Sequence, residues 1–214
     1  MFGEMKRKAG IIVAMNLEYE ALVKAGIRGV VHSGIGKVSA ARAATEMILS
    51  EHPDCIINSG CAGGLQPGMK VFDLVIGART AYHDVWCGQG NEIGEVQGLP
   101  RFFEADPELI SMARLVEYDH KIHTGLICSG DQFLTTPEEM GGVLAKYPDA
   151  LACDMESAAI AQVCHYYKVP FLSFRLISDL NSPSREEHIN SYQGFWRDIA
   201  DDSYNVLLRL IDSL

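Results

Sequence analysis

Four carboxylic acids in this chain have the positions that acid–base chemistry requires. Glu18 follows the first apolar segment, Asp154 and Glu156 open a stretch with helical spacing, and Asp179 ends another apolar segment. An ionised carboxylate in apolar surroundings is costly unless it is paired, hydrogen-bonded or neutralised. Acids that gather at the ends of strands therefore indicate acid–base chemistry on a neutral substrate.

Each acid also has an ordinary structural explanation. Glu18, Asp154 and Glu156 could be first-turn helix acids stabilised by the helix dipole. Asp179 could be the turn or N-cap residue that ends a strand. One such acid alone would not indicate catalysis, but the four together favour a functional site.

The elements expected to hold these acids are short apolar runs that alternate with amphipathic stretches, a pattern typical of a parallel sheet covered on both faces. The expected strands are residues 10–15, 28–33, 54–59, 71–80, 122–129, 150–154 and 169–178. The expected helices are residues 17–25, 36–51, 106–118, 137–146, 155–167 and 191–213. Thr136 is the expected N-cap of the helix that Pro137 opens. Ligands lie at the carboxyl ends of strands in open α/β sheets, where the acids fall.

Two glycine-rich turns and one aromatic residue accompany the acids. The turns are Ser33-Gly34-Ile35-Gly36-Lys37-Val38 and Asn58-Ser59-Gly60-Cys61-Ala62-Gly63-Gly64. Neither has the spacing of a dinucleotide-binding or P-loop motif, so each is either an anion cradle or a tight turn. Phe133 lies on a polar loop after an expected strand, where an aromatic ring either packs inward or stacks on a ligand.

Composition limits the class of protein. The 214 residues are 48% hydrophobic, which suits one globular domain over residues 1–214, with residues 1–9 as a mobile N-terminus. A net charge of −10 makes nucleic acid an unexpected partner. The N-terminal residues have neither the form of a signal peptide nor the length of a membrane span, so we expect a cytoplasmic protein without a membrane partner.

Metal and cofactor motifs are absent from the sequence. The six cysteines form no C-x-x-C pair, and the seven histidines have no H-x-x-x-H or H-x-x-E-H spacing. We therefore expect no metal site and no cofactor. The irregular segment 85–105, with Trp86, Phe102 and Phe103, is the expected interface segment, because so long a loop is usually functional.

Six motifs follow one another in a recognisable order. They are G-I-I-x-A-M-x-x-E, S-G-I-G-K-V, N-S-G-C-A-G-G-L, S-G-D-x-F, D-M-E-S-A-A-I-A and R-L-I-S-D, with the aromatic residue of the fourth at Phe133. In this order they resemble the bacterial 5′-methylthioadenosine/S-adenosylhomocysteine nucleosidases of the purine nucleoside phosphorylase superfamily. The resemblance runs from about residue 10 to the final helix. It implies a single-domain, three-layer α/β/α fold with a central mixed, mostly parallel sheet.

The resemblance implies three catalytic roles. Asp179, assisted by Ser178, would protonate the purine at N7, since adenine leaves well only as a neutral base. Glu18 would activate the attacking water. Glu156 would hold the ribose hydroxyls while positive charge develops on the sugar, where negative carboxylates are favourable.

The resemblance also implies a substrate pocket for a small nucleoside. Met155 would lie against the ribose, Phe133 would stack on the adenine, and the Leu134 backbone would read the edge of the base. Met15 and Ile35 would line the pocket for the 5′ substituent. The remaining residues assigned to substrate binding are Cys61, Ala62, Gly63 and Asp154.

The chain departs from the family pattern around the 5′ pocket. Between Met15 and Ile35 it is shorter than the usual member by roughly a β-hairpin, and Cys61 stands where a hydroxyl residue is common. Asp154 replaces the more usual glutamate, and the aromatic residues expected after Tyr82-His83-Asp84 are not evident, although Trp86 could substitute. These changes leave the acid–base set intact.

Three readings of the activity follow. Water is favoured over phosphate as the nucleophile because the charge of Glu18 would oppose a phosphate dianion. A phosphorylase or a futalosine-type nucleosidase on the same fold is the first alternative. A non-catalytic nucleoside-binding module is the second, although unused buried acids would destabilise it. The family is typically homodimeric, so we expect a homodimer whose partner completes the 5′ pocket.

Overall fold

The computed structural model describes residues 7–180, 184–198 and 205–214. Its strands are β1 (Ala9–Val13), β2 (Val30–His32), β3 (Cys55–Gly64), β4 (Leu74–Tyr82), β5 (Phe103–Glu104), β6 (Ile122–Ser129), β7 (Ala150–Asp154) and β8 (Phe171–Leu180). Its helices are α1 (Asn16–Lys24), α2 (Lys37–Glu51), α3 (Pro107–Arg114), α4 (Pro137–Lys146), α5 (Ser157–Tyr167), α6 (Arg185–Asp198) and α7 (Asn205–Asp212).

The strands form one mixed sheet in which parallel pairs predominate. Parallel pairs are β1–β2, β1–β3, β3–β8, β4–β6 and β6–β7, and antiparallel pairs are β3–β7, β4–β5 and β4–β8. The pairs β3–β8, β8–β4, β4–β6, β6–β7 and β7–β3 close a ring of five strands. This closure brings the carboxyl ends of β3, β7 and β8 together, although they are far apart in the sequence.

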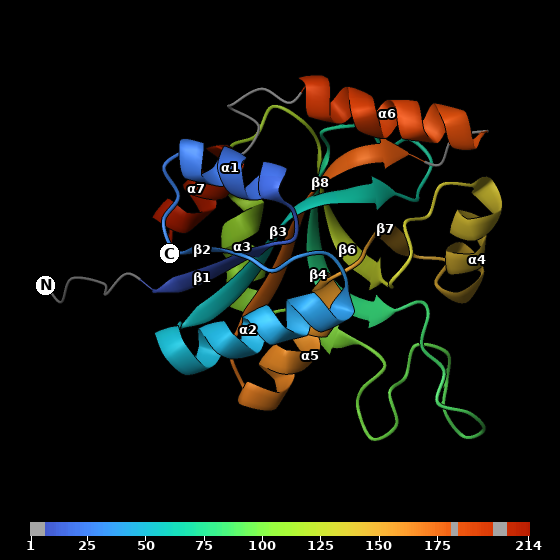
Figure 1. Cartoon of the computed structure of the whole chain (residues 1–214), viewed down its shortest axis with the longest axis horizontal. Coiled ribbons are helices and arrows are strands. Elements are labelled where there is room, and N and C mark those ends of the chain that lie inside the picture. Colours follow the sequence, from blue (N-terminus) through green and yellow to red (C-terminus); the bar gives the residue numbers. More distant parts are fainter. Residues whose placement is uncertain (1–6, 181–183, 199–204) are drawn as a thin grey trace, which may run out of the picture.

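Helices cover both faces of the sheet and complete three layers. In Figure 1, α2 and α5 lie along the lower side of the sheet, and α1, α6 and α7 lie along the upper side. Alternate residues of a strand point to opposite faces. Accordingly, Ile12 and Ile56 pack in the core with α2 and α5, whereas Ile11 and Ile57 pack in the core with α1, α3 and α7. The predicted three-layer fold is therefore confirmed.

Several elements agree with the sequence-based expectations, but β3 continues to Gly64, so the predicted glycine-rich turn over residues 58–64 is part of a strand. Strand β7 and helix α4 have the predicted bounds. Thr136 caps α4 as expected, because its side chain accepts from the Glu139 N–H while Glu139 reaches back to the Thr136 backbone. Helix α5 begins at Ser157, two residues later than predicted, and Glu156 is its N-cap residue.

The C-terminal region differs from the prediction of one helix over residues 191–213. The structure describes two helices there, and residues 199–204 of the predicted helix lie outside the described residues. Helix α6 begins at Arg185, because the Ser184 hydroxyl accepts from the Glu187 N–H at 3.2 Å and caps the first turn. The sequence Ser184-Arg185-Glu186-Glu187 carries the S-x-x-E signature of this cap.

The N-terminal and interface expectations also need correction. Strand β1 begins at Ala9, and the Arg7 N–H donates to the Leu214 carbonyl at 2.9 Å, so the predicted mobile segment is too long at its C-terminal end. Its first six residues lie outside the described residues. Phe103 belongs to β5 and is only 3% exposed, and Phe102 is partly buried, so neither is free to anchor a partner. Trp86 remains 64% exposed.

Within residues 7–180, 184–198 and 205–214, no helix has both the length and the apolar composition that crossing a bilayer requires.

Candidate active site

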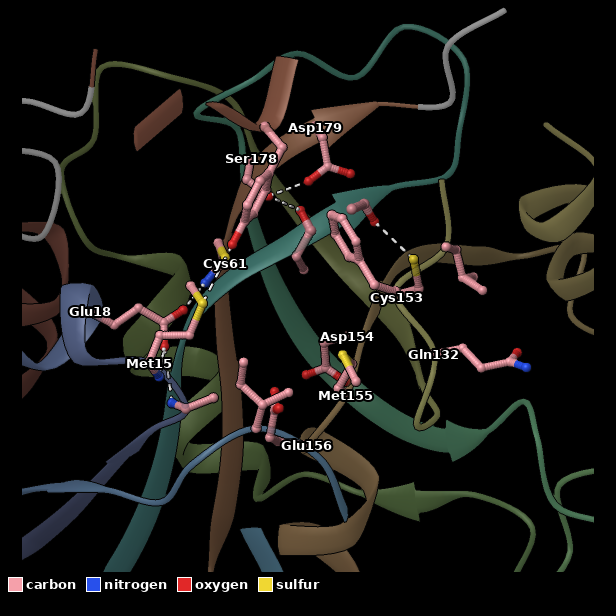
Figure 2. A pocket seen from close by; sticks show the side chains of 17 residues that line it. Met15, Glu18, Cys61, Gln132, Cys153, Asp154, Met155, Glu156, Ser178 and Asp179 are labelled. Carbon is pink, nitrogen blue, oxygen red and sulfur yellow. Dashed lines mark hydrogen bonds between the residues drawn. The ribbon is translucent and has the colours of Figure 1, made fainter. Parts of the chain in front are cut away.

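The predicted site residues line a single cavity of about 360 Å³ at the carboxyl ends of the strands. All thirteen of them contribute to its wall, and so do four residues that the sequence analysis did not assign, namely Ala14, Gln132, Cys153 and Tyr192. Figure 2 shows Glu18 on one side, Ser178 and Asp179 on a second, and Asp154, Met155 and Glu156 on a third. The cavity therefore presents acids to its contents from three directions.

Glu18 is held by backbone N–H groups from two neighbouring strand ends. Its Oε2 accepts from Ala14 and Met15 at 3.0 Å each, and its Oε1 accepts from the Cys61 N–H at 2.9 Å. Gly60 permits this approach, because a Cβ at its φ of 132° would overlap Glu18 Oε1. The side chain is 1% exposed and therefore has a fixed orientation toward the cavity.

A bulge in β8 directs two consecutive side chains into the cavity. Ala62 pairs with Ile177 and Gly63 pairs with Asp179, so Ser178 has no partner on β3. Consecutive strand residues normally point to opposite faces, and a bulge re-aims one of them. Ser178 and Asp179 consequently both line the cavity, and the Ser178 hydroxyl donates to Asp179 Oδ1 at 2.5 Å. A Cβ on Gly63 would lie 2.9 Å from Asp179 Oδ2, so this glycine gives the carboxyl its space.

Arg175 lies beneath the cavity as a fully buried cation. Its Nη2 is 2.6 Å from Asp154 Oδ2 and 3.5 Å from Glu156 Oε2, and its Nη1 donates to the Ser59 carbonyl at 3.1 Å. Burial by itself would lower the pKa of Arg175, but Asp154, Glu156 and Glu18 outweigh that effect and raise it. The guanidinium is therefore neutralised by acids of the protein itself.

Asp154 also links β6, α5 and Arg175 through its carboxylate. It accepts from the Ser129 hydroxyl at 2.5 Å and from the Ser157 N–H at 3.2 Å, in addition to its ion pair with Arg175. Its oxygens thus have protein partners at the beginning of α5, while the residue still contributes to the cavity wall.

The surroundings of Glu156 change its pKa. Burial raises its pKa to about 7, with Asp154 and Glu18 adding to the rise and Arg175 and the Gly36 N–H opposing it. The Gly36 N–H donates to Glu156 Oε1 at 2.9 Å, at a glycine whose φ is 92°. The turn that the sequence left open between anion cradle and tight turn therefore supplies a donor to a carboxylate.

Aromatic and sulfur-containing side chains form the remaining wall. The Phe133 ring lies 5.2 Å from the Tyr192 ring, and the Tyr192 hydroxyl donates to Met15 Sδ at 3.4 Å. Phe133 is half exposed and Ile35 is 56% exposed, so both lie at the rim. The aromatic rings of Phe133 and Tyr192 and the side chain of Met15 thus form an apolar part of the cavity wall.

A charged clamp joins two walls of the cavity. Lys37 Nζ is 2.7 Å from Asp84 Oδ2, which also accepts from the Asp131 N–H at 2.8 Å. Asp131 Oδ1 in turn accepts from the Lys37 N–H at 2.8 Å. The turn that carries Ile35 and the loop that carries Phe133 are therefore fixed relative to each other.

Comparison with known proteins matches both the fold and the sequence. A model of the phosphorylase superfamily matches residues 18–212. The 5′-methylthioadenosine/S-adenosylhomocysteine nucleosidase of Haemophilus influenzae (strain PittGG) is 35% identical over 205 residues, which are 94% of this chain and 88% of that protein. The chain belongs to this nucleosidase family within the phosphorylase superfamily.

Solved structures give the same result for the fold. The nucleosidase of Neisseria meningitidis in complex with methylthio-immucillin-A superposes with a TM-score of 0.88 and 34% identity, covering 97% of this chain and 100% of that one. The native futalosine hydrolase of Helicobacter pylori strain 26695 also has a TM-score of 0.88, at 28% identity and with 99% of this chain and 100% of that one covered.

Three residues important to this nucleosidase-family site were missed from the sequence. Arg175 was quoted within a motif but given no role, although a charged residue inside the apolar run Phe171–Ile177 is a usable signal. His188 lies 3.0 Å from Asp179, on the part of α6 before residue 191, where the predicted helix began. Tyr192 falls inside the predicted helix and lines the cavity, but it was given no role. Among the described residues, no three His, Cys, Asp or Glu side chains gather as a metal site would need.

We expect Glu156→Gln to change the pH dependence of stability. Because burial raises the pKa of Glu156 from 4.5 to about 7, the folded state holds its proton more tightly. Its contribution to stability is therefore full below about pH 4.5 and is lost as the pH rises to about 7. The thermal midpoint of Glu156→Gln, measured against wild type, should rise between pH 5 and pH 8. The exposed Glu138→Gln is the matched control, and a difference that does not vary with pH would contradict the assignment.

Proposed function

We propose that this protein hydrolyses the N-glycosidic bond of 5′-methylthioadenosine and S-adenosylhomocysteine, releasing adenine and the thioribose. The observation that carries the proposal is the placement of Glu18 and Asp179 on different walls of one cavity whose wall is mostly apolar. Hydrolysis of such a bond needs a base beside the attacking water and an acid beside the leaving purine. The cavity supplies both to a nucleoside held between them.

Asp179 is the proposed general acid at the purine N7. Adenine is a poor leaving group as an anion, and protonation lets it depart as a neutral base. The carboxyl is 2% exposed, and its two oxygens face Ser178 and His188. Those contacts fix its direction, so the proton is delivered to one position of the ring.

Glu18 is the proposed general base for water. Each carboxylate oxygen can accept two hydrogen bonds, and Oε1 has one protein donor, the Cys61 N–H, so it keeps an acceptor site for water. The proton that water loses passes to Glu18 as the oxygen attacks C1′. Cys61 stands where the family commonly has a hydroxyl residue, and its burial raises the pKa of the thiol, so it acts here as a weak neutral donor at most.

Glu156 is the proposed partner of the ribose hydroxyls. An ionised carboxylate near the sugar stabilises the positive charge of an oxocarbenium-like transition state. Met155 lies next to it in the cavity wall and would contact the sugar ring. Phe133 would stack on the adenine, with the Leu134 backbone and the strand end at Ala62 and Gly63 at its edge. Met15 and Ile35, joined by Tyr192, would enclose the 5′ substituent.

The charge distribution favours water over phosphate as the nucleophile. A phosphate dianion needs a cation with free donors, but Arg175 is occupied by Asp154 and Glu156. Glu18 adds a further acid where the nucleophile would bind. Two negative charges close together in a buried site repel each other strongly. A neutral water molecule beside Glu18 is not subject to this repulsion.

The function is tested by chromatography of the products from 5′-methylthioadenosine, with and without inorganic phosphate. We expect free adenine and methylthioribose at the same rate in both samples. Release only with phosphate would identify a phosphorylase. The similarity to the futalosine hydrolase supports a second candidate, which hypoxanthine release from an inosine-like nucleoside would identify. Tight binding of adenosine analogues without turnover would identify a non-catalytic module.

The role of Glu18 is tested by Glu18→Gln. The amide keeps the size of the side chain but cannot take a proton, so we expect turnover to fall about 100-fold or more while nucleoside affinity changes little. Glu20→Gln, an exposed acid on the same helix, is the matched control. Unchanged turnover in Glu18→Gln would exclude the proposed base.

We also propose a homodimer in which the partner covers the rim of the cavity. Exposed apolar side chains support it, since Ile35 in the cavity wall is 56% exposed, Val38 82% and Trp86 64%. Such a group of side chains is typical of an interface. Sedimentation should give twice the chain mass, and a fully active monomer would contradict the proposal.

A cytoplasmic location is proposed as well, because all six cysteines are unpaired, as suits a reducing compartment.

A further inference from the structure

His188 is a buried side chain that contacts Asp179. It comes from α6, is 1% exposed, and has its Nε2 3.0 Å from Asp179 Oδ2. Its Nδ1 lies 3.1 Å from the Leu180 carbonyl oxygen. Its ring also packs edge to face against Phe133, with 5.8 Å between the centroids. The imidazole thus contacts both the proposed acid and the proposed stacking ring.

These contacts limit where the protons can be. A carbonyl oxygen only accepts, so Nδ1 carries a hydrogen that it donates to Leu180. One further hydrogen is needed between Nε2 and Asp179 Oδ2, because two bare acceptors in contact would repel. That hydrogen belongs either to an imidazolium that faces a carboxylate or to a carboxyl group that faces a neutral imidazole. No other group in the described part of the chain pairs with Nε2, so His188 and Asp179 have a single proton to place between them.

We propose that His188 is a positioning residue that holds this proton and returns it to Asp179 for delivery to the purine N7. The proposal rests on the proposed function and concerns the same site. It makes the general acid a pair of residues, with the imidazolium form of His188 as the form that supports turnover.

The proposed step balances in protons and electrons. The Nε2–H bond of His188 breaks as an O–H bond forms on Asp179, and that O–H bond breaks as the N7–H bond forms. The electron pair of the bond between C1′ and N9 passes to the purine, which leaves as a neutral base. His188 is then a neutral imidazole and recovers its proton from solvent water, while the proton of the attacking water has passed to Glu18.

The charged and titratable neighbours of His188 favour its protonated form. Burial by itself would lower the pKa of His188, but the hydrogen bond and charge of Asp179, the Leu180 carbonyl and Glu139 of α4 outweigh it and raise that pKa. On α6 itself, Arg185, Glu186 and Glu187 are exposed, and Tyr192 is the other titratable group that faces the cavity. Activity that needs the imidazolium is present at low pH and is lost as the pH rises through this raised pKa.

The proposal is tested by His188→Gln, after adenine release by the wild type has been established. Glutamine keeps an N–H donor toward Asp179 but cannot titrate. We expect kcat to fall about tenfold or more with little change in KM, and the alkaline decline of kcat set by His188 to disappear. Wild-type kcat with the wild-type pH profile would overturn the proposal and leave His188 as a hydrogen-bond donor only. Failure of the wild type to release any purine would instead contradict the proposed function.

His123→Gln is the matched control. His123 Nε2 lies 2.9 Å from Oδ2 of the buried Asp73, so it forms a second histidine–aspartate pair, but neither residue lines the cavity. We expect its kcat and pH profile to match those of the wild type. If it reproduced the effect of His188→Gln, the effect would be a general loss of stability and the proposal would fail.

A direct measurement on the wild type covers the case in which His188→Gln does not fold. In nitrogen-15 spectra of histidine-labelled protein, the His188 ring, assigned by its contact with Phe133, should stay doubly protonated to a higher pH in the wild type than in Asp179→Asn, which removes the negative partner. A His188 ring that titrates at the same pH in both proteins would overturn the proposal.

Discussion

The site depends on one buried guanidinium and the acids that neutralise it. Arg175 is 1% exposed, and a charge in that environment is tolerated only with close partners of opposite sign. Asp154 and Glu156 supply those partners, and Glu18 contributes from the neighbouring strand end. Removal of Arg175 would leave these buried carboxylates without their cation. The same requirement fixes the acids at the base of a cavity, where a polar substrate and a water molecule can reach them.

Backbone geometry then separates the two ends of the proposed chemistry. Ring closure among five strands brings β3, β7 and β8 to one place, and the bulge at Ser178 turns Asp179 toward the purine side. Gly60 lets Glu18 and Arg175 approach β3, and Gly63 leaves space for Asp179. The proposed base on α1 and the proposed acid on β8 are thus placed by different elements, with the proposed sugar position between them. Gly60 and Gly63 of β3 therefore contribute by leaving space for charged side chains from other elements.

Much of the site could be predicted because its residues fall in ordered motifs at strand ends. Glu18, Glu156 and Asp179 were all found in this way, and all three line the cavity. The contributions of Arg175 and His188 could not be derived, since they depend on strand register and on where α6 packs. Phe103 was misjudged because a two-residue strand has no periodicity to read. The glycine turn at Gly36 was ambiguous until its N–H was seen to face Glu156.

The central claim is that this arrangement of charges selects water as the nucleophile. The most direct measurement is mass spectrometry of the sugar product formed from 5′-methylthioadenosine in oxygen-18 water with phosphate present, after rapid quenching. The account predicts methylthioribose that carries one heavy oxygen at C1′. A phosphorylated sugar without that label would show that the cavity accepts an anion beside Glu18, and it would contradict the account.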